Sequence, residues 1–119
     1  MICVPIIGPT MSRALEDIPK ASEVADIIEL RLDLIDDVNL AELLKAVDKP
    51  VIVTNRHKRE GGQFKGSEEE RVNFLQEAIA AEVDYIDIEA GTSREFLQPI
   101  LETKCKTKKI ISYHHFSLT

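Results

Sequence analysis

Acidic and basic residues alternate with apolar residues in the segment 26–33, which reads Asp-Ile-Ile-Glu-Leu-Arg-Leu-Asp. Because successive side chains of a β-strand point to opposite faces, Glu29, Arg31 and Asp33 share one face of this strand. A charged face of this kind is solvated in an antiparallel sheet, or it lines an enclosed site in a barrel. Buried carboxylate and guanidinium groups are costly unless they are paired, so the enclosed alternative requires ion pairs or a charged ligand.

Polar side chains also share one face in each of the later segments that are typical of strands. Where several parallel strands place polar groups near their carboxyl ends, those groups meet at one end of a barrel, which favours the enclosed site. The pairs are Thr54 and Arg56 in 51–56, Asp87 and Glu89 in 85–89, and Ser112 and His114 in 109–115.

Two arginines and a histidine define the chemistry that such a site would support. A guanidinium group binds a carboxylate through two parallel hydrogen bonds, so Glu29, Arg31 and Arg56 suit a small substrate with carboxylate and hydroxyl groups. Histidine titrates near neutral pH, so His114 is either a general acid and base or a strand-end residue without a role. Glu60, beside two glycines, orients this histidine if its loop folds over the strand ends.

The basic run from Arg56 to Arg59 stands out in an acidic protein, and it is either a solvated loop or a site that captures a small anion. Acidic residues outnumber Lys and Arg by 21 to 15, which gives a net charge of −6. This balance argues against nucleic acid as a partner, and the small aromatic content argues against base stacking.

A chain of 119 residues with 44% hydrophobic residues suits one small domain. No apolar run is long enough to cross a membrane, and the first residues do not form a signal peptide, so we expect a cytoplasmic protein. Cys3 and Cys105 lack the spacing of metal ligands. We therefore expect no metal site and two reduced, mostly buried thiols.

Apolar periodicity predicts strands that begin near residues 2, 26, 51, 84 and 109, the first of them buried on both faces. A helix is expected after each of the first four strands. Regular βα repetition predicts a parallel sheet in either a doubly wound or a barrel fold. Strands of a doubly wound sheet are apolar on both faces, whereas the second, fourth and fifth strands are not, so a (β/α)8 barrel of the TIM type is the predicted α/β fold.

The expected helices have recognisable ends. Asn39 is predicted to cap the second helix, Ser67 with Glu70 to form a capping box at the third, and Thr92 with Glu95 at the fourth. The apolar positions of the first helix, Met11, Leu15, Ile18 and Val24, recur at helical spacing. Pro19 is expected to kink or split that helix, and Pro99 to bend the fourth.

Four motifs along the chain resemble those of the type I 3-dehydroquinate dehydratases, in the same order and spacing. They are Glu29-Leu-Arg31-Leu-Asp33, Arg56 through Glu60-Gly-Gly62, Asp87-Ile-Glu89, and Ser112-Tyr-His114-His-Phe116. The resemblance implies a (β/α)8 barrel that removes water from 3-dehydroquinate to give 3-dehydroshikimate, with no cofactor. It also implies a mechanism in which a lysine forms an imine with the substrate ketone while a histidine moves the proton.

The resemblance assigns a role to each matching position. His114 stands where the family has its general acid and base, and Glu60 stands where the family has the glutamate that hydrogen-bonds this histidine. Residues that hold the substrate's hydroxyl and carboxylate groups correspond to Glu29, Arg31 and Arg56. Further residues that line the site correspond to Asp87, Glu89 and Ser112.

Three positions depart from the family pattern. His115 replaces an acidic or amide residue, and Pro5 replaces a serine that some relatives carry on the first strand. The imine-forming lysine belongs to the sixth strand, which would lie beyond Thr119, because residues 1–119 make up about four and a half βα units of eight. Five lysines of this chain are predicted on helices or at the amino ends of strands, namely Lys45, Lys49, Lys104, Lys106 and Lys108.

We therefore expect the isolated chain to be the inactive N-terminal half of such an enzyme, an incomplete single domain. A non-catalytic half-barrel that pairs with itself or with another chain is the alternative, because open strand edges expose backbone groups and apolar surface. On that ground we expect a homo-oligomer. A third alternative is a module that binds an anion through Arg31 and Arg56 without chemistry.

Overall fold

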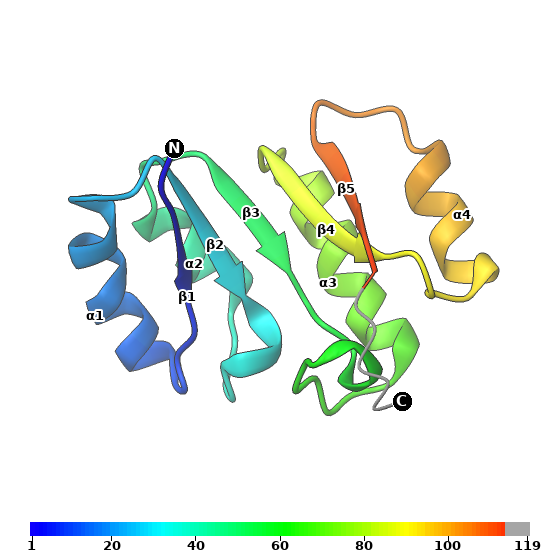
Figure 1. Cartoon of the computed structure of the whole chain (residues 1–119), viewed down its shortest axis with the longest axis horizontal. Coiled ribbons are helices and arrows are strands. Elements are labelled where there is room, and N and C mark those ends of the chain that lie inside the picture. The colour runs from blue at the N-terminus through cyan, green and yellow to red at the C-terminus, as the bar shows by residue number, and fades with distance from the viewer. Residues whose placement is uncertain (114–119) are drawn as a thin grey trace, which may run out of the picture.

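The computed structural model describes residues 1–113, which form one parallel sheet of five strands in the order β1-β2-β3-β4-β5 (Figure 1). Each strand hydrogen-bonds to the next one along the chain, and a helix lies in the connection between each such pair. This arrangement confirms the prediction of a parallel α/β sheet built from βα units. The strands are β1 (Cys3–Ile6), β2 (Ile27–Arg31), β3 (Val51–Thr54), β4 (Tyr85–Glu89) and β5 (Lys108–Ser112).

Four α-helices connect these strands and flank the sheet (Figure 1). Two short 3-10 turns, Leu32–Leu34 and Lys58–Glu60, follow β2 and β3 at their carboxyl ends. The helices are α1 (Met11–Ser22), α2 (Leu40–Ala46), α3 (Glu68–Ala80) and α4 (Arg94–Glu102).

Alternate residues of the central strands form the core with the helices. Strand β2 buries Ile28 and Leu30 completely, and strand β4 does the same with Ile86 and Ile88. The residues between them lie on the opposite side of the sheet, which we call the open face. The side chains that meet these strands from the helices include Ala14, Ile18, Leu43, Leu75, Ile79 and Ile100.

The register of the strands aligns the polar residues of the open face. Arg31 pairs with Thr54, and Thr54 pairs with Asp87, so these three side chains form one row across β2, β3 and β4. Glu89 pairs with Ser112 at the carboxyl ends of β4 and β5. Because paired residues of a parallel sheet point to the same side, the register itself gathers these groups on the open face.

Three predicted strands end earlier than expected. Strand β2 stops at Arg31, and Asp33 belongs to the 3-10 turn that follows. Strand β3 stops at Thr54, so Arg56 lies in the connection to α3, and β5 stops at Ser112. His114 lies outside the described residues.

The predicted helix caps are partly correct. Asn39 accepts a hydrogen bond from the backbone N–H of Glu42, as expected of an N-cap. Ser67 and Glu70 form the complete predicted capping box at α3. The box predicted for Thr92 with Glu95 is wrong, because Ser93 occupies the N-cap position of α4 and the Thr92 hydroxyl accepts a hydrogen bond from Arg71 instead.

Both prolines lie inside helices that continue past them, α1 and α4, so a split of the first helix at Pro19 is wrong, while the kink at Pro19 and the bend at Pro99 stay predictions. Leu15 and Val24 also differ from the predicted apolar stripe, because both are exposed. Ala14 and Ala21 take their places in the core. Small residues on this face let α1 pack closely against β1 and α2.

The two cysteines are exposed, which corrects the prediction of mostly buried thiols, and they are not bonded to each other. Cys3 and Pro5 alternate with the better-buried Val4 and Ile6, so β1 is not buried on both faces as expected. This strand has a partner on one side, β2. Within residues 1–113, none of the helices is both long and apolar enough to cross a membrane.

Candidate active site

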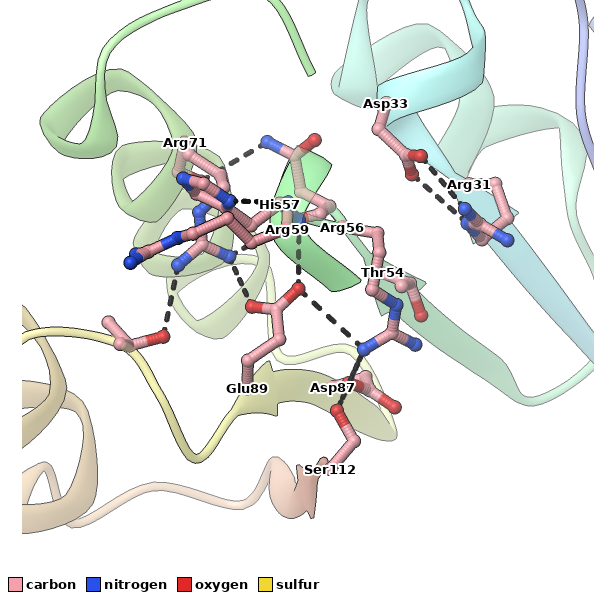
Figure 2. Close-up of polar contacts among 12 residues, drawn as sticks. Arg31, Asp33, Thr54, Arg56, His57, Arg59, Arg71, Asp87, Glu89 and Ser112 are labelled. Carbon is pink, nitrogen blue, oxygen red and sulfur yellow. Dashed lines mark hydrogen bonds and ion pairs between the residues drawn. The ribbon is translucent and has the colours of Figure 1, made fainter. Parts of the chain in front are cut away.

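Arg56 is the centre of a polar cluster at the carboxyl ends of β3, β4 and β5 (Figure 2). The residue is 8% exposed, and its Nη1 lies 2.8 Å from Asp87 Oδ1 and 2.7 Å from Ser112 Oγ. The Ser112 hydroxyl donates to the same Asp87 oxygen at 2.6 Å. These contacts hold the guanidinium of Arg56 across the ends of neighbouring strands.

Glu89 lies beside Arg56 and is 2% exposed. Its Oε1 accepts a hydrogen bond from the backbone N–H of His57 at 2.9 Å and lies 3.7 Å from Arg56 Nη1. Its Oε2 accepts a hydrogen bond from Nη1 of Arg71, a residue of α3. The carboxylate is therefore shared between two arginines and the backbone that follows Arg56.

Arg31 forms a second group, farther along the open face (Figure 2). Asp33 binds it through two hydrogen bonds, from Nε to Oδ1 at 3.0 Å and from Nη2 to Oδ2 at 2.8 Å. Asp33 Oδ2 also accepts the backbone N–H of Gln63 at 3.1 Å, which ties the loop after β3 to this pair. The hydrogen bond that Arg31 donates to Asp33 raises the pKa of Arg31, burial opposes the rise, and the charges of Asp33, Glu29 and Asp87 add to it.

Glu29 lies two residues before Arg31 on the same face of β2, and its Oε2 accepts a hydrogen bond from Thr54 Oγ1 at 2.8 Å. Burial and the charge of Glu29 raise the pKa of the nearby Cys3 thiol. A raised pKa keeps a thiol protonated at neutral pH, so Cys3 is not an activated nucleophile.

Gly62 holds the loop after β3 against the strand ends. A Cβ atom at this position would lie 2.0 Å from the backbone oxygen of Arg56, so only glycine fits. Glu60 Oε2 lies 3.5 Å from where a Cβ of Gly91 would be, and this places Glu60 above the end of β4. The backbone N–H of Ala90, the residue before Gly91, donates to Ser112 O at 2.7 Å, so Glu60 lies close to the junction of β4 and β5.

The structure thus brings together Arg56, Asp87, Glu89 and Ser112 in one connected cluster. Arg31 with Asp33 and Glu29 with Thr54 form separate pairs on the same face. Within residues 1–113, no group of three or more His, Cys, Asp or Glu side chains is placed to hold a metal ion. The arrangement instead presents guanidinium groups held by carboxylates, which suits a small anionic ligand.

Arg71 is a residue of this cluster that the sequence-based prediction missed. It is 1% exposed and occupies the apolar side of α3 next to Val72, one turn before Leu75. An arginine on the apolar stripe of a helix indicates a buried ion pair, because its charge is costly to bury alone. Its partner Glu89 belongs to β4, and the position of Arg71 on the apolar stripe does not reveal which strand supplies the partner.

Known proteins similar to this chain share a family. A family model described as type I 3-dehydroquinase matches residues 2–119. The 3-dehydroquinate dehydratase of Methanocaldococcus jannaschii is 37% identical over 121 residues, covering 100% of this chain and 55% of the relative. The bifunctional 3-dehydroquinate dehydratase/shikimate dehydrogenase of Arabidopsis thaliana is 38% identical over 125 residues, with 21% of its length covered.

Solved structures agree with the sequence relatives. The type I 3-dehydroquinate dehydratase of Clostridium difficile superposes with a TM-score of 0.85 at 31% identity, over 95% of this chain and 50% of that one. The 3-dehydroquinate dehydratase of Aquifex aeolicus gives a TM-score of 0.71 at 33% identity, over 98% of this chain and 53% of that one. The fold therefore matches about half of the type I dehydroquinase barrel, and the chain spans about half the length of most of these relatives. Because the family model covers nearly every residue, this chain belongs to the type I 3-dehydroquinase family.

Proposed function

We propose that this chain supplies the N-terminal half of the active site of a 3-dehydroquinate dehydratase, which removes water from 3-dehydroquinate to give 3-dehydroshikimate. The observation that carries this proposal is the cluster around Arg56, built at the carboxyl ends of three parallel strands and closed by the loop that contains Gly62. Barrel enzymes place their sites at this end of the strands. Relatives that match the chain from end to end are named for this activity. A cytoplasmic location belongs to the same proposal.

In this proposal, Glu29, Arg31 and Arg56 bind the substrate. The two guanidinium groups attract its carboxylate, and Glu29 accepts hydrogen bonds from its hydroxyl groups. Asp33 already fixes the orientation of Arg31, and Asp87 with Ser112 fixes that of Arg56. A site that is oriented before the ligand arrives loses less conformational entropy on binding.

His114 is the proposed general acid and base, and Glu60 is the proposed partner that orients it. Support comes from the position of Glu60 above Gly91, next to the hydrogen bond between Ala90 and Ser112. Ser112 ends β5, and His114 follows two residues later. The loop after β3 therefore brings Glu60 to the part of the sheet from which His114 continues.

The covalent step of the proposed mechanism requires a lysine that becomes reactive in a desolvated pocket. Lys58 and Lys65 lie on the loop at the carboxyl ends, but both are exposed. Lys108 begins β5 at the opposite end, near the ring of Tyr85, and Lys109 Nζ binds the backbone oxygens of Leu101 and Thr103. We therefore propose that the imine-forming lysine comes from the second half of the barrel.

Fragment complementation tests this division of the site. The isolated chain is mixed with the part of the Methanocaldococcus jannaschii relative that it does not cover, and formation of dehydroshikimate is followed by absorbance. We expect no turnover from either piece alone, turnover from the mixture, and loss of that turnover when the chain carries H114A. Ordinary turnover by the chain alone would contradict the half-site. A stable mixed complex without turnover would contradict the proposed function.

Binding without chemistry is the second candidate, and it is favoured because both arginines proposed to bind the substrate, Arg31 and Arg56, belong to this half. In that case calorimetry shows dehydroquinate binding to the isolated chain, while borohydride traps no imine. The complementation experiment separates the two candidates, because a binding module gains no turnover from the second half.

A further inference from the structure

Arg71 ties together segments that are distant in the sequence. Its guanidinium donates from Nε to Glu68 Oε1 at 2.6 Å, from Nη2 to Thr92 Oγ1 at 3.0 Å, from Nη1 to the backbone oxygen of Asn55 at 3.0 Å, and from Nη1 to Glu89 Oε2. The side-chain amide of Asn55 returns a hydrogen bond to the backbone oxygen of Arg71 at 3.2 Å. Helix α3 is thereby joined to the ends of β3 and β4.

The backbone on both sides of Arg56 is held by hydrogen bonds that involve Arg71, directly or through Glu89. The preceding residue, Asn55, accepts a hydrogen bond from Arg71 through its backbone oxygen. The following residue, His57, donates its backbone N–H to Glu89, whose other oxygen is held by Arg71. The backbone that carries Arg56 is therefore fixed before and after this residue by one buried guanidinium.

The contacts of Glu89 also affect whether Arg56 binds Asp87 or Glu89. Arg56 Nη1 lies 2.8 Å from Asp87 but 3.7 Å from Glu89, because Glu89 is already engaged by Arg71 and His57. Without Arg71, the nearly buried Glu89 would keep one cationic neighbour, Arg56. An uncompensated buried charge is costly, so Arg56 would turn toward Glu89 and leave Asp87 and Ser112.

We propose that Arg71 is a positioning residue. It acts through Glu89 to keep the Arg56 guanidinium directed at Asp87 and Ser112, where the ligand would bind. The inference rests on the proposed function for its ligand, 3-dehydroquinate. Arg71 itself is closed off from a ligand: it is 1% exposed, and its four partners surround it.

Apolar packing does not explain an arginine at this position. Val72, Leu75 and Ile79 already pack α3 against the sheet. Burial lowers the pKa of Arg71, but the hydrogen bonds and charges of Glu68 and Glu89 more than offset this effect, so the guanidinium stays charged. A buried ion pair adds little net stability over apolar residues of the same volume, whereas it fixes one arrangement of its partners.

The test compares R71K and R71M with V72A, which removes apolar contacts from the neighbouring buried position of the same helix. In the free chain, NMR follows hydrogen exchange at the His57 amide and the shift of the Arg56 Nε–Hε signal. Calorimetry then measures the affinity for 3-dehydroquinate. We expect faster exchange and a shifted Arg56 signal in R71K and R71M, with affinity about tenfold weaker in R71K and weaker still in R71M. V72A should lose stability and leave these readouts unchanged.

Each outcome bears on a separate statement. If V72A weakens binding as much as R71K does, or if the Arg56 and His57 signals of R71K match those of the parent, then Arg71 is only structural and the inference fails. If the parent itself does not bind dehydroquinate, the assignment of this ligand to the isolated chain fails, while complementation still tests the proposed function and the NMR comparison still decides the role of Arg71. Should both Arg71 variants unfold, T92V removes a single hydrogen bond to Arg71, and a shifted Arg56 signal in T92V is then the expected result.

Discussion

Arginines on the open face are held by carboxylates of the same chain. Asp33 occupies Nε and Nη2 of Arg31, and Asp87 shares Arg56 with Ser112 and, at a longer distance, with Glu89. Under the proposed function, a ligand carboxylate would meet guanidinium groups whose orientation is set and whose charge is partly balanced. Such an arrangement attracts the ligand less strongly but fixes its geometry, and a fixed geometry favours one small carboxylated molecule over another.

The pH dependence of stability can be predicted for Glu68. The hydrogen bond from Arg71 lowers the pKa of Glu68, burial opposes this, and the charges of Arg71, His57 and Arg59 lower it further. A carboxyl group whose folded pKa lies below its unfolded value of about 4.3 contributes stability above that pH, and the contribution is lost as pH falls through the folded pKa. We expect E68Q to lower the free energy of unfolding by about 1 kcal/mol at neutral pH, after allowance for solvent screening. On acidification, the free energy of unfolding of E68Q should then fall less steeply than that of the parent.

Urea unfolding between neutral pH and pH about 3 measures this difference. E69Q is the matched control, because Glu69 is the exposed neighbour of Glu68 on the first turn of α3. Parallel pH profiles for the parent and E68Q would show that the pair with Arg71 does not contribute.

At the scale of elements, the loop after β3 and the first turn of α3 act as one unit. The capping box of Ser67 and Glu70 starts the helix directly after the loop, and Arg71 follows on the first turns of the same helix. The left-handed backbone of Gly61, with φ of 86°, closes the short 3-10 turn before it. The helix start therefore determines where Arg71 lies, and the loop determines where Glu60 lies.

Gly62 offers a test of this unit. A Cβ at Gly62 would meet the backbone oxygen and carbonyl carbon of Arg56 at 2.0 and 2.3 Å, so G62A must push the loop away from the strand end. We expect a loss of roughly 1–3 kcal/mol in the free energy of unfolding. We also expect faster hydrogen exchange at the backbone amide of residue 62, which in the parent donates to the backbone oxygen of His57. G66A is the control, since its Cβ would meet the Phe64 side chain, which can turn aside. Equal losses in both variants would mean that the close contact with Arg56 is unimportant.

At the scale of the molecule, both outer strands of the sheet have one neighbour each. Strand β1 pairs with β2 and strand β5 pairs with β4, so one backbone edge of each lacks a strand partner among residues 1–113. Large apolar residues lie near these edges, namely Ile2, Ile7 and Ile111. Open edges and exposed apolar residues together favour association with further strands.

We expect the isolated chain to self-associate at micromolar concentration, as measured by sedimentation. I111K places a charge on β5, where Ile111 is 49% exposed, and should shift the chain toward monomer. V24K changes a residue that is 62% exposed between α1 and β2 and should leave the association unchanged. A compact monomer for the parent chain would contradict this prediction.

Local patterns in the sequence were sufficient for most of the fold. The alternation in Ile28-Glu29-Leu30-Arg31 placed the apolar side chains toward the helices and the charged ones on the open face, because a strand repeats every two residues. Strand β4 has the predicted bounds, and Ser67 caps the start of α3 as its capping box indicates. Caps and strand periodicity depend on residues only a few positions apart, so they can be read from the chain.

Long-range contacts decided the rest. The hydroxyl of Thr92 looked like a helix cap but binds Arg71, and the exposure of Cys3, Leu15 and Val24 depends on how many neighbours the fold supplies. The four motifs identified Arg56, Asp87 and Glu89 by type, but the sharing of Glu89 between Arg56 and Arg71 exists only where α3 crosses the ends of β3 and β4. Sequence alone therefore determined which polar residues are candidates for the site, whereas tertiary structure decided their partners, because side chains distant in the chain compete for the same carboxylate.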